Sequence, residues 1–143
     1  MVKTRGLSWP LYFILREIIY LKRIKPSFLP AAIWLIISTV LLTLPGSALP
    51  KNDWLSKIWI DKWVHIGLFS IMVFLCCWAT HNKEKTKTKF LWWAIAAIAY
   101  GVAMEFVQKY FIPNRSFDIG DIMADTVGSL LGLMYSTRRY IKK

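Results

Sequence analysis

Apolar residues along this chain gather into four runs, each close to the length that a helix needs to cross a membrane. A hydrocarbon core of about 30 Å takes roughly 20 residues at about 1.5 Å per residue. The pattern therefore predicts an all-α fold, a polytopic bundle of four transmembrane helices, of which the fourth is the most diluted by glycine and polar residues. The predicted spans are Phe28 to Leu44, Trp63 to Ala79, Phe90 to Phe106 and Ile119 to Tyr135.

The stretch before the first span mixes apolar and charged residues. Residues 11–21 are largely apolar, but Arg16 and Glu17 interrupt them and three basic residues follow. An amphipathic helix on the membrane surface fits this pattern better than a fifth span. The chain thus divides into an interfacial amphipathic segment, residues 1–27, and a transmembrane domain, residues 28–143. Since no small-residue cleavage site follows, the first span is expected to act as an uncleaved insertion signal.

Basic residues are divided unevenly between the two sides of the predicted bundle. Fourteen of the 19 Lys and Arg residues lie in residues 1–27, in the loop 81–89 and in the tail from 136, which share one side. The other side has five. Because Lys and Arg are retained in the cytoplasm during insertion, both termini are predicted to be cytoplasmic. This is the topology of a multi-pass inner-membrane protein, with the lipid bilayer as its first partner.

Composition supports the membrane class. Hydrophobic residues make up 56% of the 143, and many of the eight Trp, six Tyr and eight Phe lie beside the apolar runs, where such rings favour the headgroup layer. The net charge of +11 is spread between the runs and forms no continuous basic stripe, so no nucleic acid is expected as a partner. Cys76 and Cys77 are adjacent inside an apolar run and are interpreted as buried thiols.

Acidic and imidazole side chains concentrate at the outward-facing end of the predicted bundle. Six of the eight acidic residues fall in outer loops or outer helix ends. Ionisable groups cost about 2.5–3.5 kcal/mol each at the centre of a spanning helix, so these side chains are expected to face a polar pocket open to the outside rather than lipid. The residues predicted to share this depth are Asp61, His65, Glu105, Gln108, Asp118, Asp121 and Asp125.

Helical spacing places several of these residues on common faces. Residues three or four apart share a face, which pairs Asp61 with His65. The acidic stripe of the fourth helix continues into Gly128 and Gly132, a small-xxx-small surface that lets a neighbouring helix approach closely. The acidic face of the fourth helix is therefore also its predicted packing face.

The loop FIPNRSFDIGD before the fourth helix places Arg115 among carboxylates. A guanidinium can bridge two carboxylates or bind a phosphate through two parallel hydrogen bonds. Asp118 is expected to cap the fourth helix, whose first amides favour an anion. Carboxylates with an imidazole also suit Mg, Mn or Zn, but no ligand motif of recognised spacing is present, so no metal is predicted.

Two interpretations of the titratable residues stay open at this stage. Asp61 can orient the imidazole of His65 as an acid/base pair, or cap the second helix while His65 makes a packing hydrogen bond. Glu105 can act as a general base or form an i, i+4 pair with Lys109.

Three motifs in combination resemble the VanZ-like family of bacterial integral membrane proteins, named for a member associated with teicoplanin resistance. They are DKWVH, with Asp61 and His65; EFVQ, with Glu105 and Gln108; and NRSFDIGDIMADTVGSLLG. The resemblance runs over residues 59–135, and where the family often has Asn this chain has Asp125. It implies a role in the bacterial cell envelope, linked to glycopeptide (teicoplanin) resistance.

The leading hypothesis is a membrane protein that recognises, and as an enzyme would modify, an anionic envelope lipid or lipid-linked precursor at the outer leaflet. The alternative is a non-enzymatic binding or assembly partner whose polar cluster is structural; a small transporter ranks third. Cofactor and oligomeric state stay open. The candidate catalytic residues are Glu105, His65 and Asp121. The candidate substrate-binding residues are Arg115, Asp61, Gln108, Asp118, Asp125 and Ser116.

Overall fold

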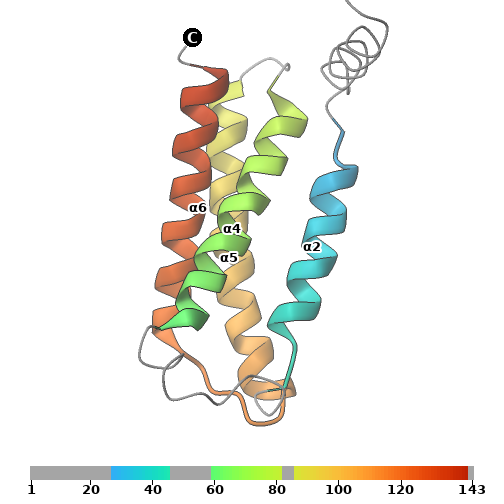
Figure 1. Ribbon diagram of the computed structural model, residues 1–143, viewed down its shortest axis with the longest axis vertical. Coiled ribbons are helices and arrows are strands. Elements are labelled where there is room, and N and C mark those ends of the chain that lie inside the picture. Colours follow the sequence, from blue (N-terminus) through green and yellow to red (C-terminus); the bar gives the residue numbers. More distant parts are fainter. Residues whose placement is uncertain (1–26, 46–58, 82–85, 142–143) are drawn as a thin grey trace, which may run out of the picture.

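A computed structural model of the chain describes residues 27–45, 59–81 and 86–141. These residues form helices and connecting turns, with no strand among them, and the all-α prediction is confirmed. The helices are α2 (Leu29–Leu42), α4 (Ile60–Thr80), α5 (Thr86–Phe111) and α6 (Ile119–Tyr140) (Figure 1). The predicted N-terminal amphipathic helix lies outside the described residues.

Two of the described helices, α4 and α5, are long and apolar enough to cross a membrane. They have 21 and 26 residues and extend beyond the predicted apolar runs, because their polar ends continue the helical hydrogen bonding. The 14 residues of α2 span only about 21 Å, which is shorter than a hydrocarbon core of about 30 Å. Helix α6 contains several polar and glycine residues, which lower its hydropathy. The prediction of four spans is therefore supported for α4 and α5, and it stays a prediction for the other two helices.

The helix boundaries follow from local sequence. Pro30 lies in the first turn of α2, where its missing N–H group costs no helical hydrogen bond. α5 ends at Phe111, two residues before Pro113, which disfavours helical backbone in the residue preceding it. Asn114 then adopts a left-handed conformation with φ of 59°, which a short polar residue tolerates, and the chain turns towards α6.

The closest helix pair is α4 with α6, which lie side by side with α5 packed against both (Figure 1). Two glycines of α6 make this approach possible. A Cβ atom added to Gly128 would lie 2.5 Å from the carbonyl oxygen of Ile66, and one added to Gly132 would lie 2.5 Å from that of Ser70. The Ser70 hydroxyl also donates a hydrogen bond to the Gly128 carbonyl at 2.8 Å. The predicted small-residue packing face is confirmed.

Helix α2 lies beside this group of three helices and is attached to it by hydrogen bonds. The Trp34 indole donates to the Leu68 carbonyl at 2.9 Å, and the hydroxyls of Thr39 and Tyr100 are 2.9 Å apart. Apolar core residues such as Phe69, which is fully buried, fill the space between the helices. Both cysteines are free; Cys77 is buried, as expected, whereas Cys76 is only half-buried.

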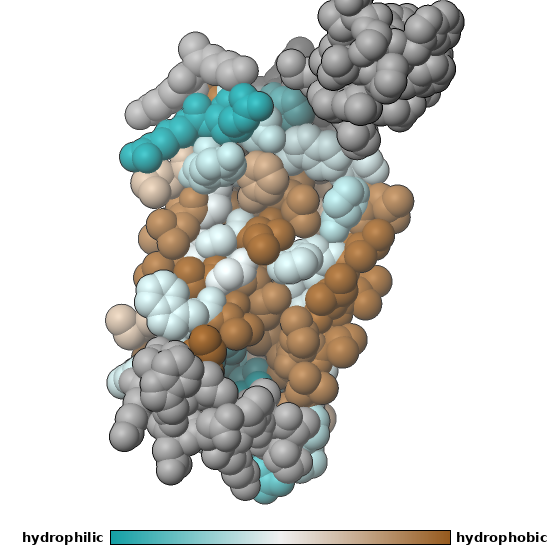
Figure 2. All heavy atoms as spheres, viewed as in Figure 1, coloured by the Kyte–Doolittle hydropathy of each residue, from teal (hydrophilic) through white to brown (hydrophobic). Residues whose placement is uncertain are grey.

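The outer surface of the helices is largely apolar. Figure 2 shows apolar side chains across the middle of one face and hydrophilic side chains towards its ends. Large apolar residues are exposed on every described helix, for example Ile36 on α2, Ile71 on α4, Trp92 on α5 and Leu130 on α6. An apolar surface of this extent is typical of a protein that contacts lipid.

Candidate functional site

Three helix ends meet at one end of the molecule: the start of α4, the end of α5 and the start of α6 (Figure 1). The polar residues that were expected to share one depth come from these ends. The structure brings six of the seven into one network, which we call the carboxylate cluster. Its members are Asp61, His65, Glu105, Asp118, Asp121 and Asp125, together with Lys62.

Lys62 is the centre of the cluster. Its ammonium group forms ion pairs with the carboxylates of Asp118 and Asp121, and its Nζ lies 3.3 Å from Asp61 Oδ2. The Lys62 side chain is only 14% exposed. Sequence reasoning counted Lys62 merely as an outer basic residue. Its role could have been recognised from its position three residues before His65, because this spacing puts both side chains on the α4 face that meets α6.

His65 pairs with α6 and not with its own helix. Its Nδ1 lies 2.8 Å from Asp125 Oδ1, and its Nε2 lies 3.9 Å from Asp121 Oδ2. Of the two interpretations left open by the sequence, the one in which Asp61 orients this imidazole is wrong, because the glycine contact brings α6 close enough for Asp125 to take that role. Asp61 does not cap α4 either, since the capping position is Trp59; its side chain is 51% exposed in the first turn.

Glu105 ties the end of α5 to the start of α6. It is 1% exposed, and its Oε2 accepts a hydrogen bond at 2.9 Å from the backbone N–H of Asp118. Asp118 in turn caps α6, because its Oδ1 accepts a hydrogen bond at 2.7 Å from the Gly120 N–H; this prediction is confirmed. Among the described residues Glu105 forms no ion pair with Lys109, whose Nζ lies instead 5.3 Å from the centre of the Tyr110 ring.

The electrostatics of the exposed rim follow from this geometry. The Lys62 ammonium holds the pKa of the Asp118 carboxyl below its usual value, against the opposing effect of partial burial. The hydrogen bond from Gly120 acts in the same direction. Asp118 is therefore a carboxylate at neutral pH, in contact with the largely enclosed ammonium group of Lys62.

Gln108, Arg115 and Ser116 lie outside the cluster. The Gln108 amide donates to the Leu42 carbonyl at 2.8 Å and so fastens the end of α2. Ser116 is exposed in the loop. Arg115 was expected among the carboxylates, but Lys62 takes that place. Within the described ranges Arg115 forms no ion pair, and its buried Nε has no hydrogen-bond partner.

Three carboxylates of the cluster have the spacing of possible metal ligands. One oxygen from each of Asp61, Asp118 and Asp121 lies within 4.8 Å of the others. Such oxygens suit a hard divalent cation. The ammonium of Lys62 already contacts all three, however, so the lysine supplies the positive charge that a metal would bring.

Comparisons with known proteins agree with the motifs of this cluster. The VanZ/LLP1 family model matches residues 33–139, from within α2 almost to the end of α6. An uncharacterized protein of Schizosaccharomyces pombe is 30% identical over 112 residues, which cover 76% of this chain and 63% of that protein, so the chain spans less than two thirds of its relative. No solved structure matches the chain. With the two apolar helices, the family match indicates a membrane protein. The chain belongs to the VanZ-like family, described as VanZ/LLP1.

Proposed function

We propose that this protein is a multi-pass membrane protein that recognises an anionic envelope lipid or lipid-linked precursor at the end of the bundle where the carboxylate cluster lies. The excess of basic residues on the opposite side supports an orientation with that end outside the cytoplasm and both termini inside. In a bacterial cell this is the outer leaflet of the cytoplasmic membrane. A link to glycopeptide (teicoplanin) resistance is part of the same proposal.

The observation that carries the proposal is the state of Arg115. The neighbouring carboxylates of Asp118 and Asp121 are already paired with Lys62, which leaves the guanidinium without an ion pair among the described residues. Arg115 lies in the loop between α5 and α6, at the same end as the cluster. A guanidinium with unused donors suits a phosphate, which it binds through two parallel hydrogen bonds.

The carboxylate cluster, at the same end of the bundle as the loop that contains Arg115, includes the groups that proton transfer requires. His65 is oriented by Asp125 at 2.8 Å, and Asp121 is within 3.9 Å of its other ring nitrogen. A carboxylate that fixes one ring nitrogen leaves the other available to exchange a proton. In this proposal His65 is the acid/base group, and Glu105, bound to the Asp118 amide, holds the loop that positions Arg115.

Replacement of Arg115 tests the recognition step. Arg115→Gln should weaken the binding of polyisoprenyl phosphate in detergent micelles about 10–100-fold, because a hydrogen bond to a charged group contributes about 1.5–3 kcal/mol. Arg115→Lys should keep part of the affinity, since it keeps the charge but loses the two-point geometry. Arg138→Gln is the matched control, because Arg138 is exposed in the last turn of α6, at the other end.

Cells provide the second measurement. Arg115→Gln and Glu105→Gln should each change teicoplanin susceptibility and envelope lipid composition while the purified variants stay folded. Unchanged binding and unchanged lipid composition for Arg115→Gln would refute the recognition proposal. Loss of the fold in both variants would point to a structural role instead.

A non-enzymatic assembly role is the second candidate, favoured by the completeness of the network. Lys62, His65 and Glu105 all have partners inside the protein, and His65, Glu105, Asp121 and Asp125 are each at most 5% exposed. On this alternative the cluster only holds α4, α5 and α6 together. His65→Gln separates the two candidates: retained resistance with an intact fold supports assembly, whereas lost resistance with an intact fold supports acid/base chemistry.

A further inference from the structure

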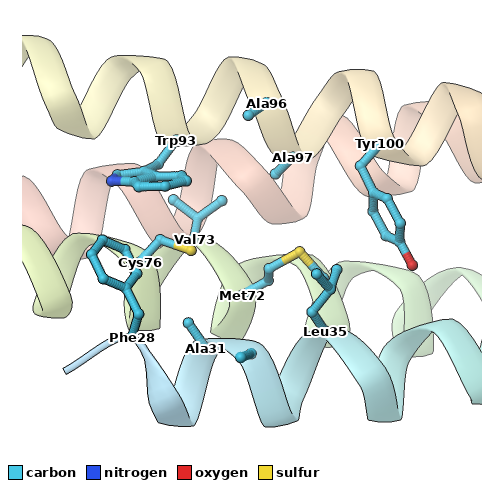
Figure 3. A pocket seen from close by; sticks show the side chains of 11 residues that line it. Phe28, Ala31, Leu35, Met72, Val73, Cys76, Trp93, Ala96, Ala97 and Tyr100 are labelled. Atoms are coloured by element: carbon cyan, nitrogen blue, oxygen red, sulfur yellow. The ribbon is translucent and has the colours of Figure 1, made fainter.

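An apolar cavity of about 320 Å³ lies between α2, α4 and α5, in the part of these helices away from the carboxylate cluster. Figure 3 shows the side chains that surround it. Its walls are aliphatic, aromatic and thioether groups, and the Tyr100 hydroxyl at one end is paired with Thr39. The principal lining residues are Phe28, Leu35, Met72, Trp93, Ala96 and Tyr100.

The cavity exists because small residues face each other across it. Ala31 and Ala32 of α2 and Ala96 and Ala97 of α5 line the space and leave it open. Larger side chains of the two helices meet only at its ends: the ring centroids of Phe28 and Trp93 are 5.5 Å apart, and the hydroxyls of Thr39 and Tyr100 are 2.9 Å apart (Figure 3). The hydrogen bonds of α2 to Leu68 and Tyr100 hold the helix at this distance. Water needs two to four polar partners to occupy a cavity, and these walls do not provide them. The space therefore suits an apolar occupant, and its size is within the range of about 300–1,000 Å³ for ligand pockets.

A second hollow, of about 430 Å³, shares part of its wall with the cavity and is lined in part by polar side chains. The two share Trp93 and Ala96, and the second is also lined by Thr80, Lys89 and Trp92. Lys89 lies two turns before Ala96 on α5, about 10 Å along the helix axis. In the described part of the chain Lys89 forms no ion pair, and it lies on the side that the distribution of basic residues assigns to the cytoplasm.

We propose that these two neighbouring hollows bind one anionic phospholipid, with an acyl chain between α2 and α5 and the phosphate beside Lys89. The flanking faces of α2 and α5 expose large apolar residues, including Ile33, Ile36 and Ile95, so hydrocarbon chains are the medium next to the opening. An ammonium group next to an indole at the end of an apolar slot matches the order of phosphate and chain in a phospholipid. This site is separate from the one proposed at Arg115, and neither depends on the other.

Filling the cavity from its exposed wall tests the proposal. The full-length protein, purified in detergent, is incubated with phosphatidylglycerol, and bound lipid is counted by native mass spectrometry. Ala96→Phe should lower retention of one phosphatidylglycerol at least about tenfold, because the new ring takes the space of the buried chain. Ala99→Phe is the matched control: Ala99 is an exposed alanine on the same helix that does not line the cavity. Ala32→Phe fills the same space from α2 and replaces Ala96→Phe if that variant does not fold.

Lys89→Gln tests the position of the headgroup. It should reduce the preference for phosphatidylglycerol over phosphatidylcholine about fivefold without abolishing chain binding, since one basic side chain near the surface contributes a modest attraction. Inorganic phosphate should not displace the lipid. Equal retention by Ala96→Phe and Ala99→Phe would overturn the proposal, and so would displacement by phosphate alone. Arg115→Gln should leave this lipid bound, which distinguishes failure here from failure of the site at Arg115.

Discussion

Replacing Lys62 by Met should be among the most damaging single substitutions at the end of the bundle where the carboxylate cluster lies. The Lys62 side chain is 14% exposed and its Asp121 partner is 7% exposed, so this ion pair is largely removed from water. Removing one partner of a buried pair costs about 3–5 kcal/mol, because the other charge is left without compensation. Asp61 and Asp118 are 51% and 47% exposed, and their loss of the same cation costs only about 0–1 kcal/mol each.

The expected loss of unfolding free energy is therefore about 3–5 kcal/mol, of which Asp121 accounts for most. It is measured by titrating SDS into detergent micelles and following helix content by far-UV circular dichroism. Lys87→Met is the matched control, because Lys87 is exposed near the start of α5 and should change the free energy by less than about 0.5 kcal/mol.

Second substitutions show which carboxylate is responsible. Adding Asp121→Asn to Lys62→Met should restore most of the lost stability, because the buried uncompensated charge disappears. Adding Asp118→Asn should restore less than about 1 kcal/mol, since that carboxylate is half exposed to solvent. Equal rescue by the two, or a Lys62→Met variant as stable as Lys87→Met, would refute the assignment of Lys62 as the buried counter-ion.

Three other substitutions, followed by the same titration, separate neighbouring effects. Asp118→Asn keeps a side chain that can cap α6 but loses the ion pair with Lys62, which holds the pKa of the Asp118 carboxyl low. The ion pair stabilises the fold above about pH 4, and this contribution is lost as the pH falls. The unfolding free energies of variant and wild type should therefore converge in acid. Gly128→Ala should destabilise the protein by about 1–3 kcal/mol, because the new Cβ would lie 2.5 Å from a backbone oxygen of α4. Gly67→Ala is the control: its new Cβ would have no atom within 4 Å, so it should be neutral or stabilise by up to about 1 kcal/mol. A double-mutant cycle of His65→Gln and Asp125→Asn should give a coupling of about 1–3 kcal/mol for their contact at 2.8 Å.

Each of these expectations has an opposing result. A difference between wild type and Asp118→Asn that stays constant between about pH 7 and pH 3 would mean that the ion pair does not stabilise the fold. Equal effects of the Gly128 and Gly67 substitutions would contradict the close approach of α4 and α6. A cycle between His65 and Asp61 that gives as much coupling as the one with Asp125 would contradict the pairing across helices.

The sequence alone was sufficient to predict the four helices that the structure describes and the end of the bundle at which the carboxylate cluster lies. Apolar runs need hydrogen-bonded backbone in a membrane, and helices provide it locally, so the pattern of a run predicts its structure without knowledge of its neighbours. The cap at Asp118 and the glycine face of α6 could also be predicted from the sequence, because both depend on residues close together in the chain. The ends of the helices were harder to predict, since α4 and α5 continue into polar residues.

Which side chains pair was decided only by the tertiary structure. Spacing on one helix allowed Asp61 as the partner of His65, but the contact of Gly128 with α4 brings Asp125 to the imidazole instead. The same contact brings Lys62 to the carboxylates among which Arg115 was expected. Periodicity determines the face on which a residue lies, whereas the distance and rotation between two helices determine which charges meet, and those depend on the packing of residues that are far apart in the chain.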